Sequence, residues 1–363
     1  MNSVQNTFPE LRRVDVLPTN KIRLYIGAAG FEDRSLGWCD QLAAQSEVIA
    51  SAYVFKYINP KGRNRTLELR AKLRRLGASR VVPIKYDVLC PQQLEATLPS
   101  KLALDGYDEI VLDISAMTKL LELLVLFRLR SFRGTVRIAY SEAEEYCPSQ
   151  SEYDPVKGEM ARTARYPSRG AEQIVRLRCL NSIRMQGQPV TLVAFAAFNE
   201  KLVSHSVGFI SPHRLILING RPPRREYAWR EQATFEIHKR FAKEYESDNP
   251  IDASGLLRRV ASTLDYRETV ERLEEIYQEH GRFERIICVA TGSKMQTVGL
   301  FLAKVMHPDI QIEYPTPDSY LVKDITHGVR CVHEVVIPQF AEFIEELDGA
   351  KASGLAYDNA VAI

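Results

Sequence analysis

Phe283–Lys304 reads FERIICVATGSKMQTVGLFLAK, and this stretch decides the fold. Its first part, Arg285–Ala290, is a short apolar run rich in β-branched residues, which is typical of a central parallel strand and too short for a buried helix. The turn Thr291–Lys294 follows, and a helical pattern of apolar residues begins at Met295. A strand that ends in such a turn and opens a helix presents hydroxyls, N–H groups and one ammonium, which suit an anion such as phosphate.

A second copy of the pattern supports the anion-site interpretation. The simpler alternative is that Thr291 or Ser293 only caps the helix and that Lys294 is an ordinary surface lysine. However, Tyr107–Leu120, YDEIVLDISAMTKL, again gives a strand, a turn with hydroxyl groups, a lysine and the start of an apolar helix. The strands and hydroxyl residues of the two copies align at one spacing, and the two lysines differ from it by one residue.

The composition is that of a globular protein and gives no sign of bulk nucleic-acid binding. The chain has 363 residues, enough for two domains, of which 45% are hydrophobic and 26% charged. The net charge is +2, so any basic site must be local. Six cysteines without close pairing indicate reduced thiols in a cytosolic protein, not a zinc site or disulfide framework. We expect no signal peptide in Met1–Arg13 and no membrane span, because the longest apolar run, Leu120–Phe127, is far too short.

Strands alternate with helices on both sides of a polar connector. Besides the strand before each lysine, the pattern predicts strands at Lys21–Gly27, Ser51–Ile58, Arg80–Tyr86, Thr135–Tyr140, Val190–Ala196, Leu215–Ile218 and Ile310–Tyr314. We therefore predict an α/β fold of two tandem Rossmann-like units with mostly parallel, doubly wound sheets, related by a pseudo-twofold axis. The expected boundaries are an arm at 1–20, unit one at 21–150, a connector at 151–189, unit two at 190–335, and a terminal helix and tail at 336–363.

Matched turns follow the strands of both copies. In a doubly wound sheet, ligands bind outside the carboxyl ends of the strands, so we expect these turns to form the site. The candidate ligand-binding residues are Phe31, Glu32, Asn59, Asp113, Ser115, Thr118 and Lys119 in copy one, and Phe198, Asn199, Asn219, Thr291, Gly292, Ser293 and Lys294 in copy two. Pairing of the copies would bring Lys119 and Lys294 toward one doubled cationic site. The alternative is that the basic turns are solvated loops and the hydroxyls only cap helices.

The sequence assigns no catalytic residue. Asp113, beside Ser115, is either a general base or ribose contact, or a structural acid that bonds backbone N–H groups in the turn. The histidines form no catalytic or metal-binding pattern, and His327 and His333 fall in the final connector. We therefore predict no metal site and no cofactor.

One family shares the decisive stretch. VATGSKMQTVGLF, at Val289–Phe301, resembles the strand, turn and helix that mark CARF domains, the CRISPR-associated Rossmann-fold sensors of cyclic oligoadenylates, and LDISAMTKLLELL, at Leu112–Leu124, looks like a diverged version. In that family the turns after the first and fourth strands contact the cyclic nucleotide, and two domains pair about a twofold axis. The resemblance thus implicates the candidate residues of those two kinds of turn, which are Phe31, Glu32, Ser115, Thr118, Lys119, Phe198, Asn199, Thr291, Gly292, Ser293 and Lys294. The second copy has one glycine where the family often has two, and the first copy has none, so its backbone approaches a ligand less closely.

The resemblance and the doubled anion site together predict a cytoplasmic protein that binds a cyclic or linear oligonucleotide second messenger in antiviral defence signalling. Two alternatives stay open. One is a nucleotide-processing enzyme or ring nuclease, in which Ser115, Thr291 and the lysines position an RNA 2′-hydroxyl for attack. The other is a scaffold subunit of a defence complex that has lost its ligand. The expected partner is a nucleotide or oligonucleotide and not a membrane, and a separate effector protein and a homodimer stay open as further partners.

Overall fold

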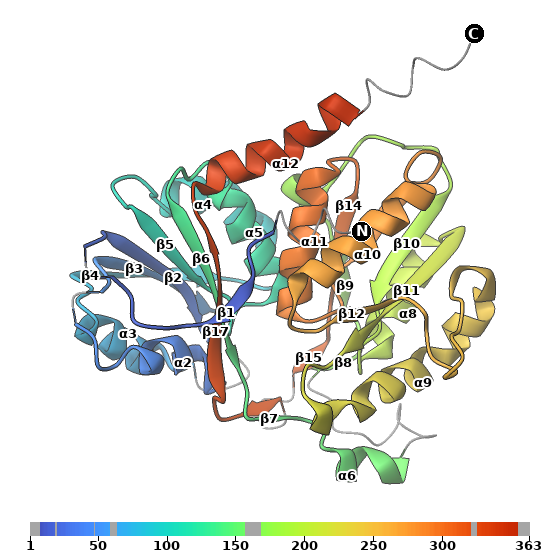
Figure 1. The fold of residues 1–363 in the computed structure, drawn as a ribbon, viewed down its shortest axis with the longest axis horizontal. Coiled ribbons are helices and arrows are strands. Elements are labelled where there is room, and N and C mark those ends of the chain that lie inside the picture. Colours follow the sequence, from blue (N-terminus) through green and yellow to red (C-terminus); the bar gives the residue numbers. More distant parts are fainter. Residues whose placement is uncertain are drawn as a thin grey trace. The chain divides into compact units, whose positions relative to one another are not determined.

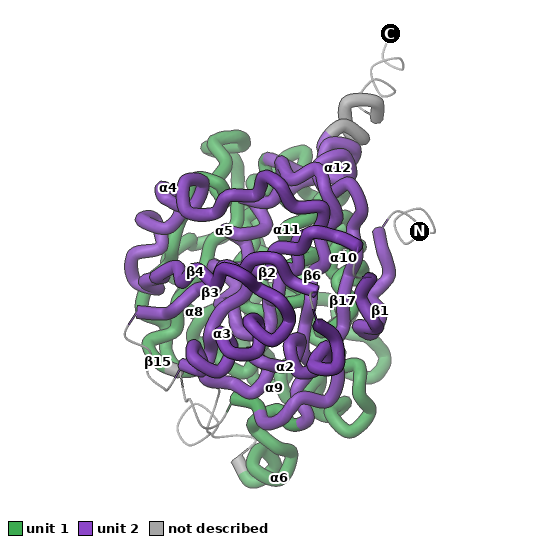
Figure 2. Tube along the Cα trace, turned by 90° about the vertical axis from the view of Figure 1, so that its left-hand side faces the viewer, with its two compact units in different colours: residues 1–5, 145–304, 309–326 green, residues 6–144, 305–308, 327–363 purple. Residues whose placement is uncertain are grey.

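The computed structural model describes residues 8–18, 20–46, 48–58, 64–156, 168–320 and 325–354. Within them the chain forms two compact α/β units, each with its own sheet (Figure 2). The described part of the N-terminal unit, purple in Figure 2, lies within Asn6–Glu144, Val305–Pro308 and His327–Ile363. That of the C-terminal unit, green in Figure 2, lies within Glu145–Lys304 and Asp309–Thr326.

The N-terminal unit is built on a seven-stranded sheet (Figure 1). Its parallel strands are β2 (Arg23–Ala29), β3 (Ser51–Tyr57), β4 (Arg80–Tyr86), β5 (Glu109–Asp113) and β6 (Thr135–Glu142). β17 (Cys331–Ile337) adds antiparallel to β6, and β1 (Leu11–Arg13) antiparallel to β17, which gives the order β1-β17-β6-β5-β2-β3-β4. The helices are α2 (Arg34–Gln41), α3 (Thr66–Arg75), α4 (Pro91–Lys101), α5 (Lys119–Leu129) and α12 (Phe340–Gly354). Figure 1 shows α2 and α3 on one face of the parallel strands and α4 and α5 on the other.

The C-terminal unit repeats this arrangement on a six-stranded sheet. Its parallel strands are β10 (Val190–Phe195), β11 (Arg214–Arg221), β12 (Val260–Ser262), β13 (Arg285–Val289) and β14 (Gln311–Thr316). β9 (Gln173–Val175) lies antiparallel to β14, which gives the order β12-β11-β10-β13-β14-β9. The connecting helices are α8 (Glu200–Ile210), α9 (Trp229–Glu244), α10 (Tyr266–His280) and α11 (Lys294–Met306), and the short elements are β7 (Glu145–Tyr146), α6 (Gln150–Tyr153), β8 (Ser168–Arg169), β15 (Ser319–Tyr320) and β16 (Thr326–His327).

The prediction of two Rossmann-like units is confirmed. When the parallel strands of each unit are numbered along the chain, both sheets have the order 3-2-1-4-5, which is that of a mononucleotide-binding Rossmann half. The strands before the two lysines, β5 and β13, occupy the same central place in two separate sheets. The apolar runs in both strands follow from burial on both faces of the sheet, since β5 is buried along its whole length and β13 in all but its first residue.

The units differ in extent from the ranges expected from the sequence. Residues 331–337, expected around the boundary between unit two and the terminal helix, form β17 in the N-terminal sheet, and residues 145–150 belong to the C-terminal unit. Part of the expected connector, 151–189, supplies β9 to the C-terminal sheet. The reason is that alternation of strand and helix marks only the parallel core, because antiparallel strands need no helical crossover and leave no such pattern.

Buried charges hold the amino ends of the strands in the N-terminal sheet. The Arg23 side chain on β2 is fully buried, and its Nε donates to Glu109 Oε1 on β5 over 2.5 Å. Arg137 on β6 donates to the same carboxylate oxygen over 2.7 Å and to both oxygens of Glu334 on β17 over 3.0 Å. One buried ionic network therefore links β2, β5, β6 and β17.

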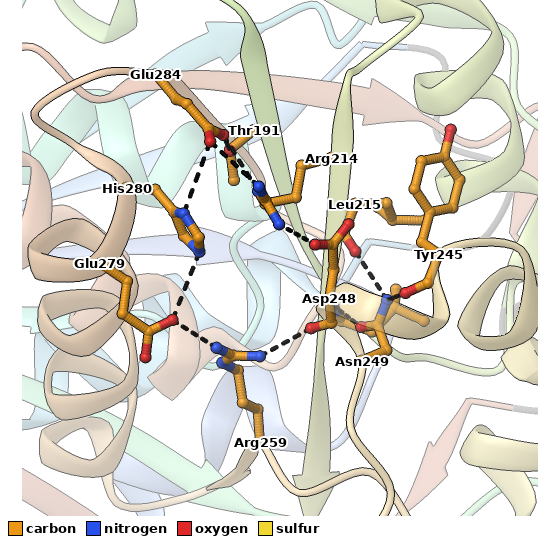
Figure 3. A network of polar contacts seen from close by, with 11 residues as sticks. Thr191, Arg214, Leu215, Tyr245, Asp248, Asn249, Arg259, Glu279, His280 and Glu284 are labelled. Atoms are coloured by element: carbon orange, nitrogen blue, oxygen red, sulfur yellow. Dashed lines mark hydrogen bonds and ion pairs between the residues drawn. The ribbon is translucent and has the colours of Figure 1, made fainter.

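A second polar network lies at the amino edge of the C-terminal sheet (Figure 3). Arg214, at the start of β11, pairs with Asp248 and with Glu284, which stands just before β13. The Nδ1 atom of His280 lies 3.8 Å from Glu284 Oε1, and burial together with the charge of Arg214 lowers the pKa of this histidine. Because ligands bind at the opposite edge of such sheets, this network belongs to the framework.

Among the described residues, no helix combines the length and the apolar character that crossing a bilayer requires.

Candidate functional site

Each unit has one topological switch point, the place where the strand order reverses and ligands bind in open α/β sheets. It lies between β2 and β5 in the N-terminal unit and between β10 and β13 in the C-terminal unit. The turns after these strands are those that the sequence singled out. The structure brings them together: a Cβ atom at Gly30 would lie 2.8 Å from the Cβ of Ala116, and Thr291 Oγ1 bonds the backbone of Phe195.

Asp113 and Ser115 are buried in the N-terminal switch point and bond protein groups. Asp113 Oδ1 accepts from the backbone N–H of Ser115 over 3.0 Å, and Oδ2 accepts from the Tyr25 hydroxyl over 2.9 Å. Ser115 Oγ accepts from the N–H of Ser141 over 2.8 Å. Burial raises the pKa of the Asp113 carboxyl, and the hydrogen bonds from Ser115 and Tyr25 only partly offset it. Of the two roles left open for Asp113, the contacts favour the structural acid.

The rest of this turn is fixed by a tyrosine at the end of β3. The Tyr57 hydroxyl donates to the carbonyl of Ala116 over 2.8 Å and accepts from the N–H of Thr118 over 2.9 Å. Thr118 is the N-cap of α5, since its Oγ1 accepts from the N–H of Leu121 over 3.2 Å. Lys119 is the first residue of the helix and is half-buried.

The turn after β2 contains a buried arginine that the sequence reasoning missed. Arg34 is 5% exposed and pairs with Glu32 over 2.5 Å, and its Nη1 donates to the Tyr140 hydroxyl over 3.2 Å. Its charge also acts to lower the pKa of Asp113, so the guanidinium is part of the switch point. Phe31, three residues before Arg34 in the sequence, is half-buried. Arg34 stands next to the predicted residues in the sequence, but one arginine after a strand gives no sign that it is buried.

In the C-terminal unit the two hydroxyls of the TGSK turn bond the protein. Thr291 Oγ1 donates to the Phe195 carbonyl over 2.7 Å and accepts from the Phe195 N–H over 3.0 Å, which joins the ends of β10 and β13. Ser293 Oγ accepts from the N–H of Gln296 over 3.0 Å, while Gln296 Oε1 accepts from the N–H of Ser293 over 2.8 Å. This reciprocal pair is a capping box at the start of α11. The capping interpretation therefore describes Ser293, whereas Thr291 links two strands.

The two lysines hold the same structural position. Lys119 is the first residue of α5 and Lys294 is the first residue of α11, each helix following the fourth parallel strand of its unit. Both lysines are half-buried. The turn between β5 and α5 is one residue longer than that between β13 and α11, which accounts for the mismatch of one residue in the sequence alignment.

The predicted asparagines have structural contacts. Asn219 is fully buried, and it donates to the Glu231 carbonyl over 2.9 Å and accepts from Thr234 Oγ1 over 2.7 Å, which ties β11 to α9. Asn199 donates to Ser168 Oγ over 3.1 Å and to the Gly170 carbonyl over 3.0 Å. Asn59, together with most of the basic turn after it, lies outside the described residues.

Phe198 belongs to a cluster of aromatic rings around Arg230. The Arg230 guanidinium lies 4.6 Å from the Phe198 ring centroid and 5.4 Å from that of Trp229. It donates to the backbone carbonyls of Tyr146, Cys147 and Pro148 over 3.0–3.2 Å, and burial lowers its pKa to about 10. The cluster anchors the chain around β7 to the start of α9. Sequence reasoning missed it because its members come from three separate segments.

Removing the caps gives a first test of this geometry. We expect Ser293→Ala and Thr118→Ala each to lower the free energy of unfolding by about 1 kcal/mol, because each leaves a helix N–H without its side-chain acceptor. Urea unfolding of the two variants and the wild type measures the loss. Ser46→Ala at an exposed position outside the helices and strands is the control and should stay within about 0.5 kcal/mol of the wild type. A loss at the control equal to that at the caps would contradict the assignment.

Comparisons with known proteins identify no family for this chain and assign no role to the site. No protein-family model and no curated protein matches the sequence. A search of solved structures finds the cytoplasmic domain of a prokaryotic cation chloride cotransporter, at 7% identity and a TM-score of 0.23, over 84% of this chain and 99% of that one. It also finds phosphoethanolamine N-methyltransferase 1 of Haemonchus contortus, in complex with phosphoethanolamine and S-adenosylhomocysteine, at 9% identity and a TM-score of 0.21, over 78% of this chain and 73% of that one. Similarity at this level supports no inference about function.

Proposed function

We propose that the switch points bind phosphate groups of a nucleotide, and that the protein senses a cyclic or linear oligonucleotide second messenger in antiviral defence signalling. The observation that carries the proposal is the repeated lysine. In both units a lysine is the first residue of the helix that follows the fourth strand, at the switch point of a 3-2-1-4-5 sheet. Backbone N–H groups and the positive end of the helix dipole at this place favour an anion, and the ammonium adds a full charge.

The hydroxyls that cap the two helices limit which groups we assign to anion binding. Because Thr118 and Ser293 accept hydrogen bonds from their own helices, we assign phosphate binding to the lysine ammonium and the first turn of each helix. In the N-terminal unit Arg34 adds a second positive charge, although its pairing with Glu32 offsets that charge.

The same contacts weigh against the ring-nuclease alternative. A catalytic hydroxyl must be able to approach the substrate, but Ser115 Oγ is occupied by the N–H of Ser141 and Thr291 Oγ1 bonds both backbone groups of Phe195. Asp113 is buried and has both carboxylate oxygens hydrogen-bonded. This favours binding without cleavage.

Calorimetric titration with a panel of cyclic and linear oligonucleotides tests the proposal, and chromatography of each mixture reports cleavage. We expect binding of at least one member and no change in the nucleotide. Cleavage of the bound nucleotide would contradict the sensor proposal and favour the nucleotide-processing enzyme. Absence of binding across the panel would favour the scaffold subunit and overturn the proposed function.

A further inference from the structure

Three side chains with metal-binding atoms meet on the N-terminal sheet, at the carboxyl end of β6. Cys331 on β17 is paired directly opposite Glu142 on β6, and His333 stands two residues further along β17. Residues two apart on a strand project from the same face, so the antiparallel pair places the thiol, the imidazole and the carboxylate together. Cys331 and His333 are half-buried and Glu142 is buried, which leaves a path from solvent on one side.

The three donor atoms form a triangle of the size that a tetrahedral metal ion needs. Cys331 Sγ lies 3.3 Å from His333 Nε2 and 3.4 Å from Glu142 Oε2, and the last two atoms are 2.9 Å apart. Bonds of about 2.3 Å from zinc to sulfur and about 2.0–2.1 Å to nitrogen or oxygen put neighbouring donors roughly 3.3–3.6 Å apart. Changes of at most about 0.5 Å in the distances between these donor atoms would therefore give the separations that zinc coordination needs.

The same triangle excludes a catalytic triad. In a nucleophile–histidine–acid triad, the imidazole faces the nucleophile with one ring nitrogen and the acid with the other. Here a single nitrogen, His333 Nε2, lies close to both the thiol and the carboxylate. Three donor atoms that converge in this way can share one metal ion, whereas the relay of a triad needs the imidazole between the other two groups.

We propose that Glu142, Cys331 and His333 bind a zinc ion. Thiolate, imidazole and carboxylate together suit this borderline-soft dication, and three protein ligands leave the fourth position to water. The sequence predicts no metal site, because the cysteine and the histidine are 189 and 191 residues away from the glutamate. Only the pairing of β6 with β17 brings them together.

The charges around the three ligands support zinc binding and also limit the affinity for zinc. On binding, zinc replaces the thiol proton of Cys331, which passes to solvent, so that one thiolate and one carboxylate neutralise the dication. Arg13 and Arg330 are exposed and lie within electrostatic reach of Cys331. Their positive charges oppose a cation, so the affinity stays below that of the same three ligands without neighbouring arginines.

Zinc at this place would stabilise the N-terminal unit. β17 follows the rest of the N-terminal sheet by a long stretch of sequence and pairs with β6. Coordination of one ion by residues of both strands would add a link between them and oppose their separation. This role does not depend on the proposed nucleotide function.

Titration with cobalt and zinc tests the site directly. The full-length protein, reduced and freed of metal with a chelator, is titrated with Co²⁺, and thiolate-to-cobalt absorption reports a cysteine ligand. We expect about one ion per chain, displacement of Co²⁺ by Zn²⁺, and a rise in melting temperature with Zn²⁺. Cys331→Ser should remove the thiolate absorption. His333→Gln and Glu142→Gln should weaken binding by more than the roughly 10- to 100-fold that loss of an outer-shell partner costs.

Two variants serve as controls. Cys90→Ser removes another partly exposed thiol of the same unit and should leave the absorption unchanged. Arg330→Gln should raise zinc affinity by up to about fivefold, since it removes an opposing exposed charge; damage to the fold cannot imitate this gain. The proposal is overturned if the wild type shows no thiolate-to-cobalt absorption, or if Cys331→Ser and the wild type bind Zn²⁺ equally well.

Discussion

Glu109→Ala is expected to lower the free energy of unfolding by about 3–5 kcal/mol, because it leaves buried positive charge without its partner. Glu109 is fully buried and accepts from Arg23 over 2.5 Å and from Arg137 over 2.7 Å. Arg137 keeps Glu334, but neither Nη1 nor Nη2 of Arg23 has a hydrogen-bond partner in the described part of the chain. Arg23 therefore depends on this one carboxylate.

The pH dependence of the same group has a defined sign. Burial alone would raise the pKa of Glu109, but hydrogen bonds from Arg137 and Arg23 outweigh it and lower the pKa. A carboxyl whose pKa is lower in the folded state stabilises the protein above its unfolded pKa, near 4.3, and loses this contribution as the pH falls through the folded value. The difference between wild type and Glu109→Ala should thus shrink in acid.

Urea unfolding at neutral and acidic pH measures both effects. Glu68→Ala is the matched control, because Glu68 forms an exposed ion pair with Arg65 over 2.8 Å, a type of contact worth less than about 1 kcal/mol. If Glu109→Ala and Glu68→Ala unfold at the same urea concentration, the buried network does not stabilise the sheet as we infer.

The parallel core could be predicted from the sequence because its signals are local. The run at 285–290 carries its own apolar pattern and its own turn, so β13 and the start of α11 follow from about twenty residues of sequence. β17 could not be assigned in this way. Its partner β6 lies about 190 residues earlier, as the separation of Cys331 from Glu142 shows, and pairing over that distance leaves no periodic trace.

The candidate site was predictable in position and much less so in detail. The switch points, and the equivalence of Lys119 and Lys294, follow from repetition. Repetition does not show which hydroxyl groups bond the protein itself. Thr291 contacts Phe195 only because β10 and β13 are paired in the folded sheet. Arg34 shows the same limit, since burial depends on the neighbours that folding supplies.

The lysines therefore give the sharpest test of the proposed function. If Lys119 and Lys294 each contact a phosphate, Lys→Ala at either removes a charge-assisted hydrogen bond worth roughly 1.5–3 kcal/mol. Affinity for a nucleotide that the wild type binds should fall about tenfold to a hundredfold for each variant, since about 1.4 kcal/mol is a factor of ten. In the double variant the losses should add if the two sites act independently, giving a fall of about a hundredfold or more.

Calorimetric titration and melting curves of the two single variants and the double variant decide between the functional and the structural reading. Lys101→Ala and Lys243→Ala are the controls, because each removes an exposed lysine from the last turn of a helix, at the amino edge of its sheet. Folding should be affected by less than about 0.5 kcal/mol at the exposed control sites. A structural ion pair at Lys119 or Lys294 would instead lower the melting temperature and spare binding. Equal losses at the two positions would indicate two working sites, whereas a loss at Lys294 alone would indicate that the N-terminal site has decayed. If neither change weakens binding, the lysines do not hold the ligand.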